Sequence, residues 1–259
     1  MNIVVCLKQV PDTNEVRIDP KTGTLIREGV PSIINPDDKN ALEEALALKE
    51  QYNAKVTVLS MGPPQAEKAL REALSMGADE AILLTDRAFA GADTLATSRA
   101  LAAALNKIPY DIVFAGRQAI DGDTAQVGPE IAEHLNLPQI TYVEKVTVEG
   151  NELKVRRALE DGYEVINVKM PVLLTAIKEL NLPRYMNVKY IFGSEKKVIT
   201  TWSVKDIDID PSFLGLSGSP TKVKKSMTKE AKGKGELVNK SAKEAAEYAV
   251  LKLKENHFI

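Results

Sequence analysis

Short, continuously apolar runs alternate with segments of helical periodicity through the first half of this chain, and this alternation constrains its fold most. Continuous apolar runs are typical of strands that are buried on both faces. Strands that alternate with helices form a parallel sheet with helices on both faces. The sequence therefore predicts an α/β fold with a Rossmann-like parallel sheet and flanking helices. The predicted strands are residues 3–7, 55–60, 81–84 and 110–115.

Capping signals mark the helices between these runs. Asn35-Pro36-Asp37 is a typical helix start, Gly77 is a typical helix stop, and Asp93 can cap a third helix with its carboxylate. A long excursion at 11–33 interrupts the pattern, and its Lys21-Thr22-Gly23 is predicted to be a hairpin tip.

The pattern changes near residue 140. Four apolar stretches separated by short turns predict an antiparallel meander added to the parallel sheet. They are residues 140–148, 153–159, 164–169 and 172–175.

Periodicity fades beyond residue 182, and the roughly 40 residues of 195–236 offer little to bury, so they are predicted to form an extended arm. The arm ends in a clear amphipathic helix at 239–255. We therefore expect an α/β domain at 1–192 and a C-terminal arm and helix at 193–259. Docking on a partner subunit and folding back on the same domain are equally compatible with this periodicity.

Composition excludes several classes of function. The 259 residues carry a formal charge of -2, so no basic surface suggests nucleic acid as a partner. Cys6 is the one cysteine, which excludes an internal disulfide and fits a reducing compartment. No signal peptide and no apolar run long enough to span a bilayer is present, so we expect a cytoplasmic chain without membrane insertion.

The glycine-bearing stretch after the fourth predicted strand carries the clearest chemical signal. It leads into a segment of helical spacing, and the order strand, glycine loop, helix directs backbone N–H groups at an anion. Its glycines allow close approach of a ligand, and its polar side chains can cap or bind. The stretch predicts a nucleotide pyrophosphate site and reads Gly116-Arg117-Gln118-Ala119-Ile120-Asp121-Gly122-Asp123-Thr124-Ala125-Gln126-Val127-Gly128-Pro129.

Other catalytic and metal-binding patterns are missing. The chain has neither G-x-G-x-x-G nor G-x-x-x-x-G-K-[ST], and its two histidines have no cysteine partners for zinc. Cys6 lies in an apolar strand and is interpreted as a packing residue. Asp121 and Asp123 could bind Mg²⁺, but a turn residue and a helix cap are the favoured interpretation. Arg117 could pair with a phosphate or a reduced flavin ring, or form a surface ion pair.

With the glycine loop placed, nearly the whole chain resembles the β subunit of electron transfer flavoprotein. Each shared segment is weak evidence by itself, whereas their order and spacing together are specific. The segments are Leu7-Lys8-Gln9-Val10, Asn35-Pro36, Ser60-Met61-Gly62-Pro63, residues 73–79, Gly116-Arg117-Gln118-Ala119-Ile120-Asp121, residues 155–157 through 171–176, and Leu182-Pro183-Arg184-Tyr185.

The resemblance implies a heterodimer with a flavin-holding α subunit and an adenine nucleotide bound by the β subunit. Two versions of the family bind either AMP or a second FAD in the β subunit, and the small residues of 122–129 together with Asp93 and Thr94 resemble the FAD type. The implied cofactor-binding residues are Cys6, Asn35, Met61, Asp93, Thr94, Gly116, Arg117, Gln118, Ala119, Ile120, Asp121, Gly122, Asp123, Thr124, Ala125, Gln126 and Val127.

The FAD type implies electron bifurcation from NADH. One electron passes through the α-subunit flavin to an acyl-CoA dehydrogenase-type partner, and the other reduces ferredoxin or flavodoxin. No catalytic side chain is expected, because the redox chemistry belongs to the cofactor. Met186, Val188 and Ile191 match the position of the family's dehydrogenase-docking loop, although Val188 and Ile191 could equally be core residues. The alternatives are an AMP-binding structural β subunit and, by fold analogy alone, an adenine-nucleotide-binding ATPase or stress protein.

Overall fold

The computed structural model describes residues 1–12, 31–224 and 235–259. The chain divides into two compact units, Met1–Lys224 and Lys225–Ile259, which are described separately. The predicted hairpin tip at 21–23 lies outside the described residues.

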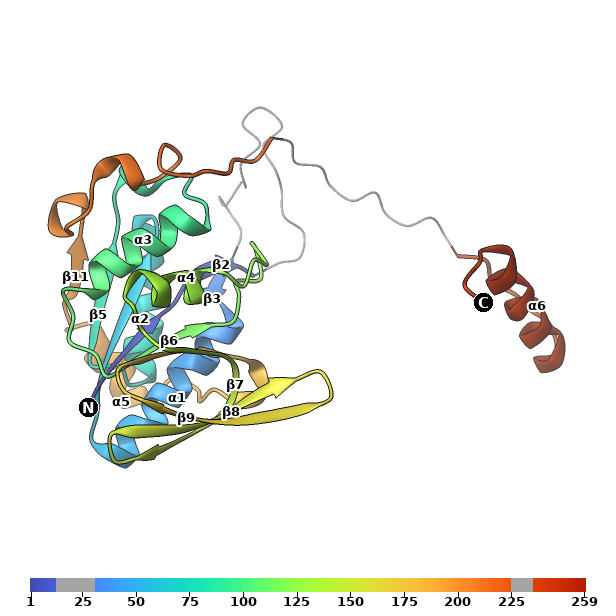
Figure 1. The fold of residues 1–259 in the computed structure, drawn as a ribbon, viewed down its shortest axis with the longest axis horizontal. Helices are drawn as coiled ribbons and strands as arrows, with labels where there is room; N and C mark the ends of the chain where they lie inside the picture. Colours follow the sequence, from blue (N-terminus) through green and yellow to red (C-terminus); the bar gives the residue numbers. More distant parts are fainter. Residues whose placement is uncertain (13–30, 225–234) are drawn as a thin grey trace. The chain divides into compact units, whose positions relative to one another are not determined.

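A nine-stranded, mostly parallel sheet forms the centre of the first unit (Figure 1). Its order is β11-β5-β4-β1-β6-β10-β7-β8-β9, and β2 and β3 form a separate antiparallel pair. The strands are β1 (Asn2–Cys6), β2 (Gln9–Pro11), β3 (Ser32–Ile34), β4 (Lys55–Met61), β5 (Glu80–Leu84), β6 (Ile112–Gly116), β7 (Gln139–Glu149), β8 (Glu152–Leu159), β9 (Gly162–Lys169), β10 (Val172–Ala176) and β11 (Ile199–Trp202).

Helices cover both faces of the sheet and bury its alternate side chains. Helices α1 and α2 enclose one core cluster with Ile3, Val5 and Phe114, and α3 and α4 enclose the other with Val4 and Val113 (Figure 1). The predicted α/β class is therefore confirmed. The α-helices are α1 (Pro36–Tyr52), α2 (Glu67–Met76), α3 (Thr94–Leu105), α4 (Val127–His134), α5 (Val188–Ser194) and α6 (Ala242–Glu255), and the short 3-10 helices are η1 (Pro64–Ala66), η2 (Arg87–Phe89), η3 (Lys178–Leu180), η4 (Val204–Asp206) and η5 (Pro211–Phe213).

The strand β10 corrects one prediction. Strands β7, β8 and β9 do form the expected antiparallel meander, but β10 lies between β6 and β7 and runs parallel to both. All five of its residues are buried, as expected for a central strand with helices on both sides. The short connection after β9 resembles a hairpin turn in sequence, yet the chain enters the middle of the sheet.

The residues after 192 correct a second prediction. Strand β11 pairs in parallel with β5 at the sheet edge, and Ile207 and Leu214 are buried in the core cluster beneath α3. The boundary predicted at 192/193 thus falls inside the first unit, which extends to Lys224.

The second unit contains the C-terminal helix α6. A capping box fixes its start, because Ser241 and Glu244 exchange side-chain and backbone hydrogen bonds, and none of its residues is buried. In the parts of the chain that the structure describes, no helix is both long and apolar enough to cross a membrane.

Candidate functional site at the carboxyl ends of the parallel strands

Three neighbouring strands end where the sequence predicts a nucleotide site. Strand β1 lies between β4 and β6, and all three run in the same direction. From β1 the chain builds outward through β4 and β5, and then crosses to the other side of β1 to form β6. This reversal of strand order is the position at which open α/β sheets bind ligands, beyond the carboxyl ends of the strands.

Two helix N-termini lie beside each other at this edge. The side chains of Cys6, Met61 and Ala115 lie on the same sheet face as α3 and α4. The Thr94 hydroxyl, in the first turn of α3, donates to Oε1 of Glu130 in the first turn of α4 at 3.1 Å and lies 3.3 Å from Oε1 of Gln126. The positive ends of both helix dipoles therefore meet at the predicted site, which favours an anionic ligand.

Asn35 shapes the first half of the loop at 117–126. Its buried side chain donates to the carbonyl of Gln118 at 2.8 Å and accepts from the amide of Ile120 at 3.0 Å. Both ends of the Asn35 amide are therefore used within the protein. In this structure Asn35 fixes the position of the loop through these two hydrogen bonds. Its predicted cofactor contact stays a prediction.

The second half of the loop is open and strained in its backbone. Asp123 and Ala125 adopt positive φ angles of 56° and 53°, a conformation that costs free energy for residues other than glycine. Gln118 donates to the carboxylate of Asp123, and the carbonyl of Ala119 accepts from the amide of Asp123 at 2.8 Å. The favoured interpretation of the sequence makes Asp123 the cap of α4, and this is wrong. Gln126 occupies the N-cap position of α4, and its side chain makes no cap bond.

Asp38 is a buried carboxylate that is not among the site residues predicted from the sequence. Its Oδ2 accepts from the amide of Lys8 at 2.7 Å, and its Oδ1 accepts from the amide of Gly116 at 2.9 Å. Burial raises the pKa of Asp38 to about 7, against the opposing effect of these hydrogen bonds. Asp38 thus joins the ends of β1 and β6 to the first turn of α1. An acidic residue in the first turn of a predicted helix, two residues after Pro36, is the sequence signal that could have pointed to it.

Lys8 and Arg117 bring positive charge to the same edge. The ammonium of Lys8 pairs with the carboxylate of Asp121 at 2.7 Å, so Asp121 is a paired residue of the turn. Arg117 lies 3.3 Å from Asp37 and places its guanidinium 5.9 Å from the ring centre of Tyr142. Burial raises the pKa of Asp37 although Arg117 opposes the shift. The ion-pair interpretation of Arg117 is thus realised, and a flavin or phosphate contact stays a prediction.

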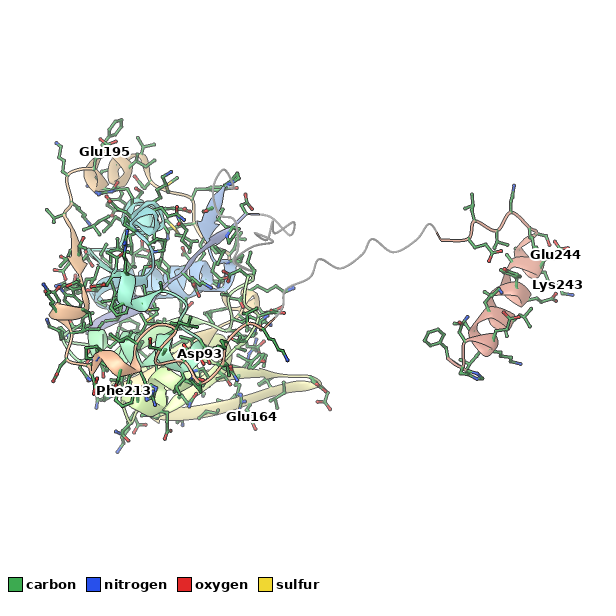
Figure 2. The ribbon with its side chains drawn as sticks, turned by 90° about the horizontal axis from the view of Figure 1, so that it is seen from above. Asp93, Glu164, Glu195, Phe213, Lys243 and Glu244 are labelled. Atoms are coloured by element: carbon green, nitrogen blue, oxygen red, sulfur yellow. The ribbon has the colours of Figure 1, made fainter. Side chains whose placement is uncertain are left out.

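Asp93 performs the capping role that the sequence predicts. Asp93, labelled in Figure 2, lies at the start of α3. Its carboxylate accepts from the amide of Ala96 at 3.1 Å. The same carboxylate accepts from the amide and hydroxyl of Thr221 at 3.0 and 2.8 Å, which ties the end of the first unit to α3. Partial burial raises the pKa of Asp93, but these hydrogen bonds outweigh burial and the pKa lies below its ordinary value. Its predicted cofactor contact stays a prediction.

An unused polar group at this edge fits a polar ligand. Oε2 of Glu130, in the first turn of α4, is buried and has no hydrogen-bond partner among the described residues. A buried polar group without a partner is costly, so a bound ligand or water would complete its hydrogen bonds. A Cβ built on Gly122 meets no atom within 4 Å in the described ranges, so the loop leaves space beside it.

The family is established by comparison with known sequences. The family description "Electron transfer flavoprotein domain" matches residues 22–207. The chain belongs to the electron transfer flavoprotein family. It is 74% identical to the electron transfer flavoprotein subunit beta of Clostridium acetobutylicum over the full length of both chains. It is also similar over the full length of both chains to the caffeyl-CoA reductase-Etf complex subunit CarD of Acetobacterium woodii, at 57% identity, and to the acryloyl-CoA reductase electron transfer subunit gamma of Anaerotignum propionicum, at 46% identity.

In this electron transfer flavoprotein β-subunit homologue, Cys6 is a packing residue with an unreactive thiol. Burial, together with the nearby Asp38 carboxylate, raises the pKa of Cys6 to about 12. The thiolate is the reactive form of cysteine, and it is absent at neutral pH in this setting. Any contact of Cys6 with a nucleotide would involve backbone or van der Waals contacts.

The predicted docking residues are exposed in this flavoprotein homologue. Met186, Val188 and Ile191 have 47, 68 and 37% of their surface exposed, so Val188 and Ile191 are not core residues. Val188 and Ile191 belong to α5, which packs against α2. Their role in docking stays a prediction.

Proposed function

We propose that this chain is the β subunit of a heterodimeric, FAD-binding and bifurcating electron transfer flavoprotein. It binds FAD beyond the ends of β1, β4 and β6, and NADH is the electron donor. One electron passes through the flavin of the α subunit to an acyl-CoA dehydrogenase-type partner. The other passes to ferredoxin or flavodoxin. The heterodimer works in the cytoplasm.

One observation carries the proposal: the N-termini of α3 and α4 lie side by side at the strand ends. A dinucleotide has two phosphates, and two neighbouring helix N-termini supply favourable dipoles for both, with backbone N–H groups at the uncapped start of α4. The open space beside Gly122 supports a ligand at the same edge.

The residues of the chain bind and orient the cofactor. Backbone amides of residues 124–127, at the uncapped start of α4, contact the phosphates, with Arg117 beside them, and Met61 packs against the adenine. Asn35 and Asp38 hold the loop in the shape that exposes those amides. When bound, FAD supplies the one- and two-electron chemistry, and no side chain is required as an acid or base.

The names of two relatives bear on the proposed electron-accepting partner. Both are described as parts of acyl-CoA reductase systems, caffeyl-CoA reductase and acryloyl-CoA reductase. A partner of the acyl-CoA dehydrogenase type is consistent with these names. The exposed side chains of Met186, Val188 and Ile191 offer a small apolar patch of the kind that a transient redox partner requires.

Counting the cofactors of the purified heterodimer tests the proposal. The complex is denatured, and the released nucleotides are identified by mass spectrometry. We expect two FAD molecules in each heterodimer and rapid reduction by NADH. One FAD and one AMP, with no reduction by NADH, would instead establish the structural AMP-binding alternative.

A further inference from the structure

An exposed apolar segment lies between two arginine contacts on the first unit. Tyr185 is 97% exposed and Phe192 is 70% exposed, and the apolar residues between them are also accessible. A segment with so few buried side chains has little packing of its own to define its conformation. Besides the packing of α5 against α2, polar contacts at its two ends hold it.

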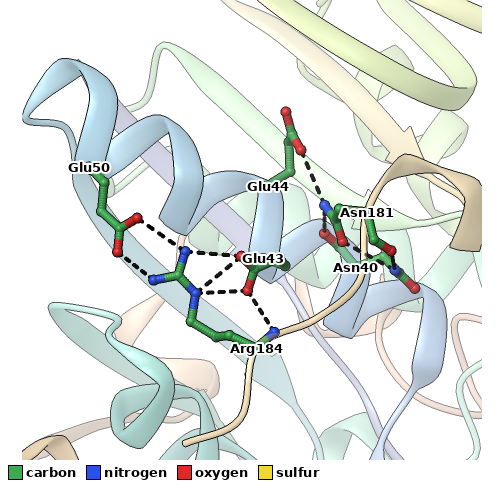
Figure 3. Close-up of polar contacts among 6 residues, drawn as sticks. All are labelled: Asn40, Glu43, Glu44, Glu50, Asn181 and Arg184. Carbon is green, nitrogen blue, oxygen red and sulfur yellow. Dashed lines mark hydrogen bonds and ion pairs between the residues drawn. The ribbon is translucent and has the colours of Figure 1, made fainter. Parts of the chain in front are cut away.

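Arg184 fixes the start of this segment to α1 (Figure 3). Its guanidinium contacts both carboxylate oxygens of Glu43, at 2.9–3.1 Å, and it reaches Oε1 of Glu50 at 2.5 Å. Its backbone amide also donates to Glu43 at 3.0 Å. The side chain of Glu43 is nearly buried, so the Arg184–Glu43 ion pair is shielded from water. The side chain of Glu50 is exposed, so the Arg184–Glu50 ion pair is open to water. Forked arginine–carboxylate contacts of this kind fix direction as well as distance.

Asn40 and Asn181 attach the chain to α1 at a second place, one helical turn before Glu43 (Figure 3). Asn40 donates to the backbone carbonyl of Asn181 at 2.7 Å, and Asn181 donates to the backbone carbonyl of Asn40 at 3.0 Å. Asn181 also donates to the carboxylate of Glu44 at 3.1 Å. The chain is therefore anchored to α1 at 181 and again at 184, directly before the apolar segment begins.

Arg71 fixes the end of the segment to α2. Its guanidinium donates to the backbone carbonyls of Ser194 at 2.5 Å and Lys197 at 2.9 Å. The hydroxyl of Ser75 donates to that of Ser194 at 2.9 Å, and the backbone carbonyl of Ser75 accepts from the amide of Asn187 at 3.1 Å. Helix α5 is therefore attached to α2 at both its N-cap and its last residue.

We infer that Arg184 and Arg71 are positioning residues that hold the segment 185–193 in the conformation that binds an acyl-CoA dehydrogenase-type flavoprotein. This inference rests on the proposed function. A segment that is already ordered loses less conformational entropy when the partner binds, and affinity rises accordingly. The two arginines act through the segment and do not contact the partner.

The experiment compares arginine variants with a variant of the docking surface itself. Arg184→Gln and Arg71→Gln remove one attachment each, Val188→Glu places a charge on the docking surface, and Arg99→Gln is the control. Arg99 is on α3, on the opposite face of the sheet from α2, and lies 4.7 Å from the ring centre of Phe213. Each heterodimer is assayed for electron transfer to a purified short-chain acyl-CoA dehydrogenase, and hydrogen–deuterium exchange is measured at 185–193.

We expect the KM for the dehydrogenase to rise about fivefold or more in Arg184→Gln and Arg71→Gln, while kcat and cofactor content stay unchanged. Exchange at 185–193 should accelerate in the same two variants and stay at the wild-type rate in Arg99→Gln. A role in fold stability alone would lower the melting temperature without separating KM from kcat.

Each other outcome identifies which claim has failed. A higher KM in Val188→Glu with wild-type values in both arginine variants would overturn the inference and leave the docking proposal standing. An unchanged KM in Val188→Glu would overturn the docking proposal itself. If Arg184→Gln does not fold, Arg184→Lys keeps the charge without the fork, and a wild-type KM in that variant and in Arg71→Gln would overturn the inference.

Discussion

Two buried side chains lie beneath the glycine loop, Asn35 and Asp38, and their hydrogen bonds determine which loop atoms face outward. Asn35 donates to the carbonyl of Gln118 and accepts from the amide of Ile120. The carboxylate of Asp38 accepts from the amides of Lys8 and Gly116. The amides of Arg117, Gly122 and Asp123 donate to backbone carbonyls, so we expect the ligand contacts at the end of the loop, where α4 begins. The binding capacity of the loop therefore depends on residues that need not touch the cofactor.

Gly122 provides a direct test of where the cofactor lies. We expect Gly122→Trp to lose the β-subunit nucleotide while the fold is kept, because the described residues leave open space beside Gly122 and the cofactor is proposed to fill it. Bound nucleotide and melting temperature are measured in the purified heterodimer.

Two matched variants complete this test. Gly122→Ala should retain the nucleotide, since its methyl group is small. Gly116→Ala should lower the melting temperature, because a Cβ at that position would lie 2.2 Å from Oδ1 of Asp38. Full nucleotide content in Gly122→Trp would place the cofactor elsewhere.

The carboxylate of Asp38 predicts an unusual pH dependence of stability. Its pKa is about 7 in the folded chain and near the ordinary 3.8 when unfolded, so between these values the folded state binds more protons. The contribution of Asp38 to the free energy of unfolding therefore falls as the pH rises through this range. Among the titratable groups that interact with it, Asp37 raises this pKa, and Cys6 stays protonated.

Asp38→Asn removes this titration. Relative to the variant, the wild-type chain should lose about 2–3 kcal/mol of unfolding free energy between about pH 5 and pH 8. Urea unfolding of both proteins at the two pH values measures the difference. A difference that does not change with pH would show that Asp38 keeps an ordinary pKa.

The sequence pointed to the loop but not to the residues that shape it. Glycines that follow an apolar strand form a local sequence pattern, and such a pattern predicts a ligand-binding loop without knowledge of the rest of the fold. The contacts of Asp38 with Lys8 and Gly116 join positions 30 and 78 residues apart, so they exist only after the sheet has formed. The assignment of Asp123 as a cap was wrong for a related reason, because α4 begins one turn later than its side chain can reach.

The N-termini of α3 and α4, which lie beside each other, differ in how their backbone N–H groups are satisfied. The N-terminus of α3 is capped by Asp93, whereas the N-cap residue of α4, Gln126, makes no side-chain cap bond. An uncapped first turn keeps backbone N–H groups available for a ligand. Of the two helices, α4 is therefore the better source of anion contacts, and α3 contributes mainly its dipole.

Asp93→Ala separates the capping role of Asp93 from a cofactor role. We expect a loss of about 1 kcal/mol in the free energy of unfolding, the usual cost of removing an N-cap aspartate. Asp86→Ala is the matched control, since Asp86 also caps a helical turn, at η2, but is not among the predicted cofactor residues. Nucleotide affinity should fall in Asp93→Ala and stay constant in Asp86→Ala. Equal affinity in the two variants would restrict Asp93 to capping.

The position of a strand in the sequence was easier to predict than the strands with which it pairs in the sheet. The apolar run of β10 was recognised, but its place between β6 and β7 depends on long-range pairing that a local turn pattern does not encode. Full burial of β10 matches its continuous apolar sequence, which is typical of a parallel strand and was a usable signal. Strand β11 has only four residues and lies at the edge, with its middle residues exposed, so its periodicity was too weak to recognise.

All strands described in the chain, and both core clusters, belong to the unit that ends at Lys224. The sheet is therefore complete without the C-terminal residues. In α6 no residue is buried, and Val250 and Leu253 leave 44 and 42% of their surface exposed along one face. A helix of this kind gains most of its stability from packing against another surface.

Removal of residues 225–259 distinguishes the two roles that the sequence allows for the C-terminal helix. If α6 docks on the α subunit, the chain 1–224 keeps its melting temperature within about 2 °C but binds the α subunit less tightly, because its own core is untouched. If α6 folds back on its own domain, the melting temperature falls instead. Leu253→Asp in the full chain should reproduce the loss of binding, and Glu247→Gln should not. Calorimetry of the purified chain and titration with the α subunit give both readouts, and a large fall in melting temperature with unchanged binding would exclude docking of α6 on the α subunit.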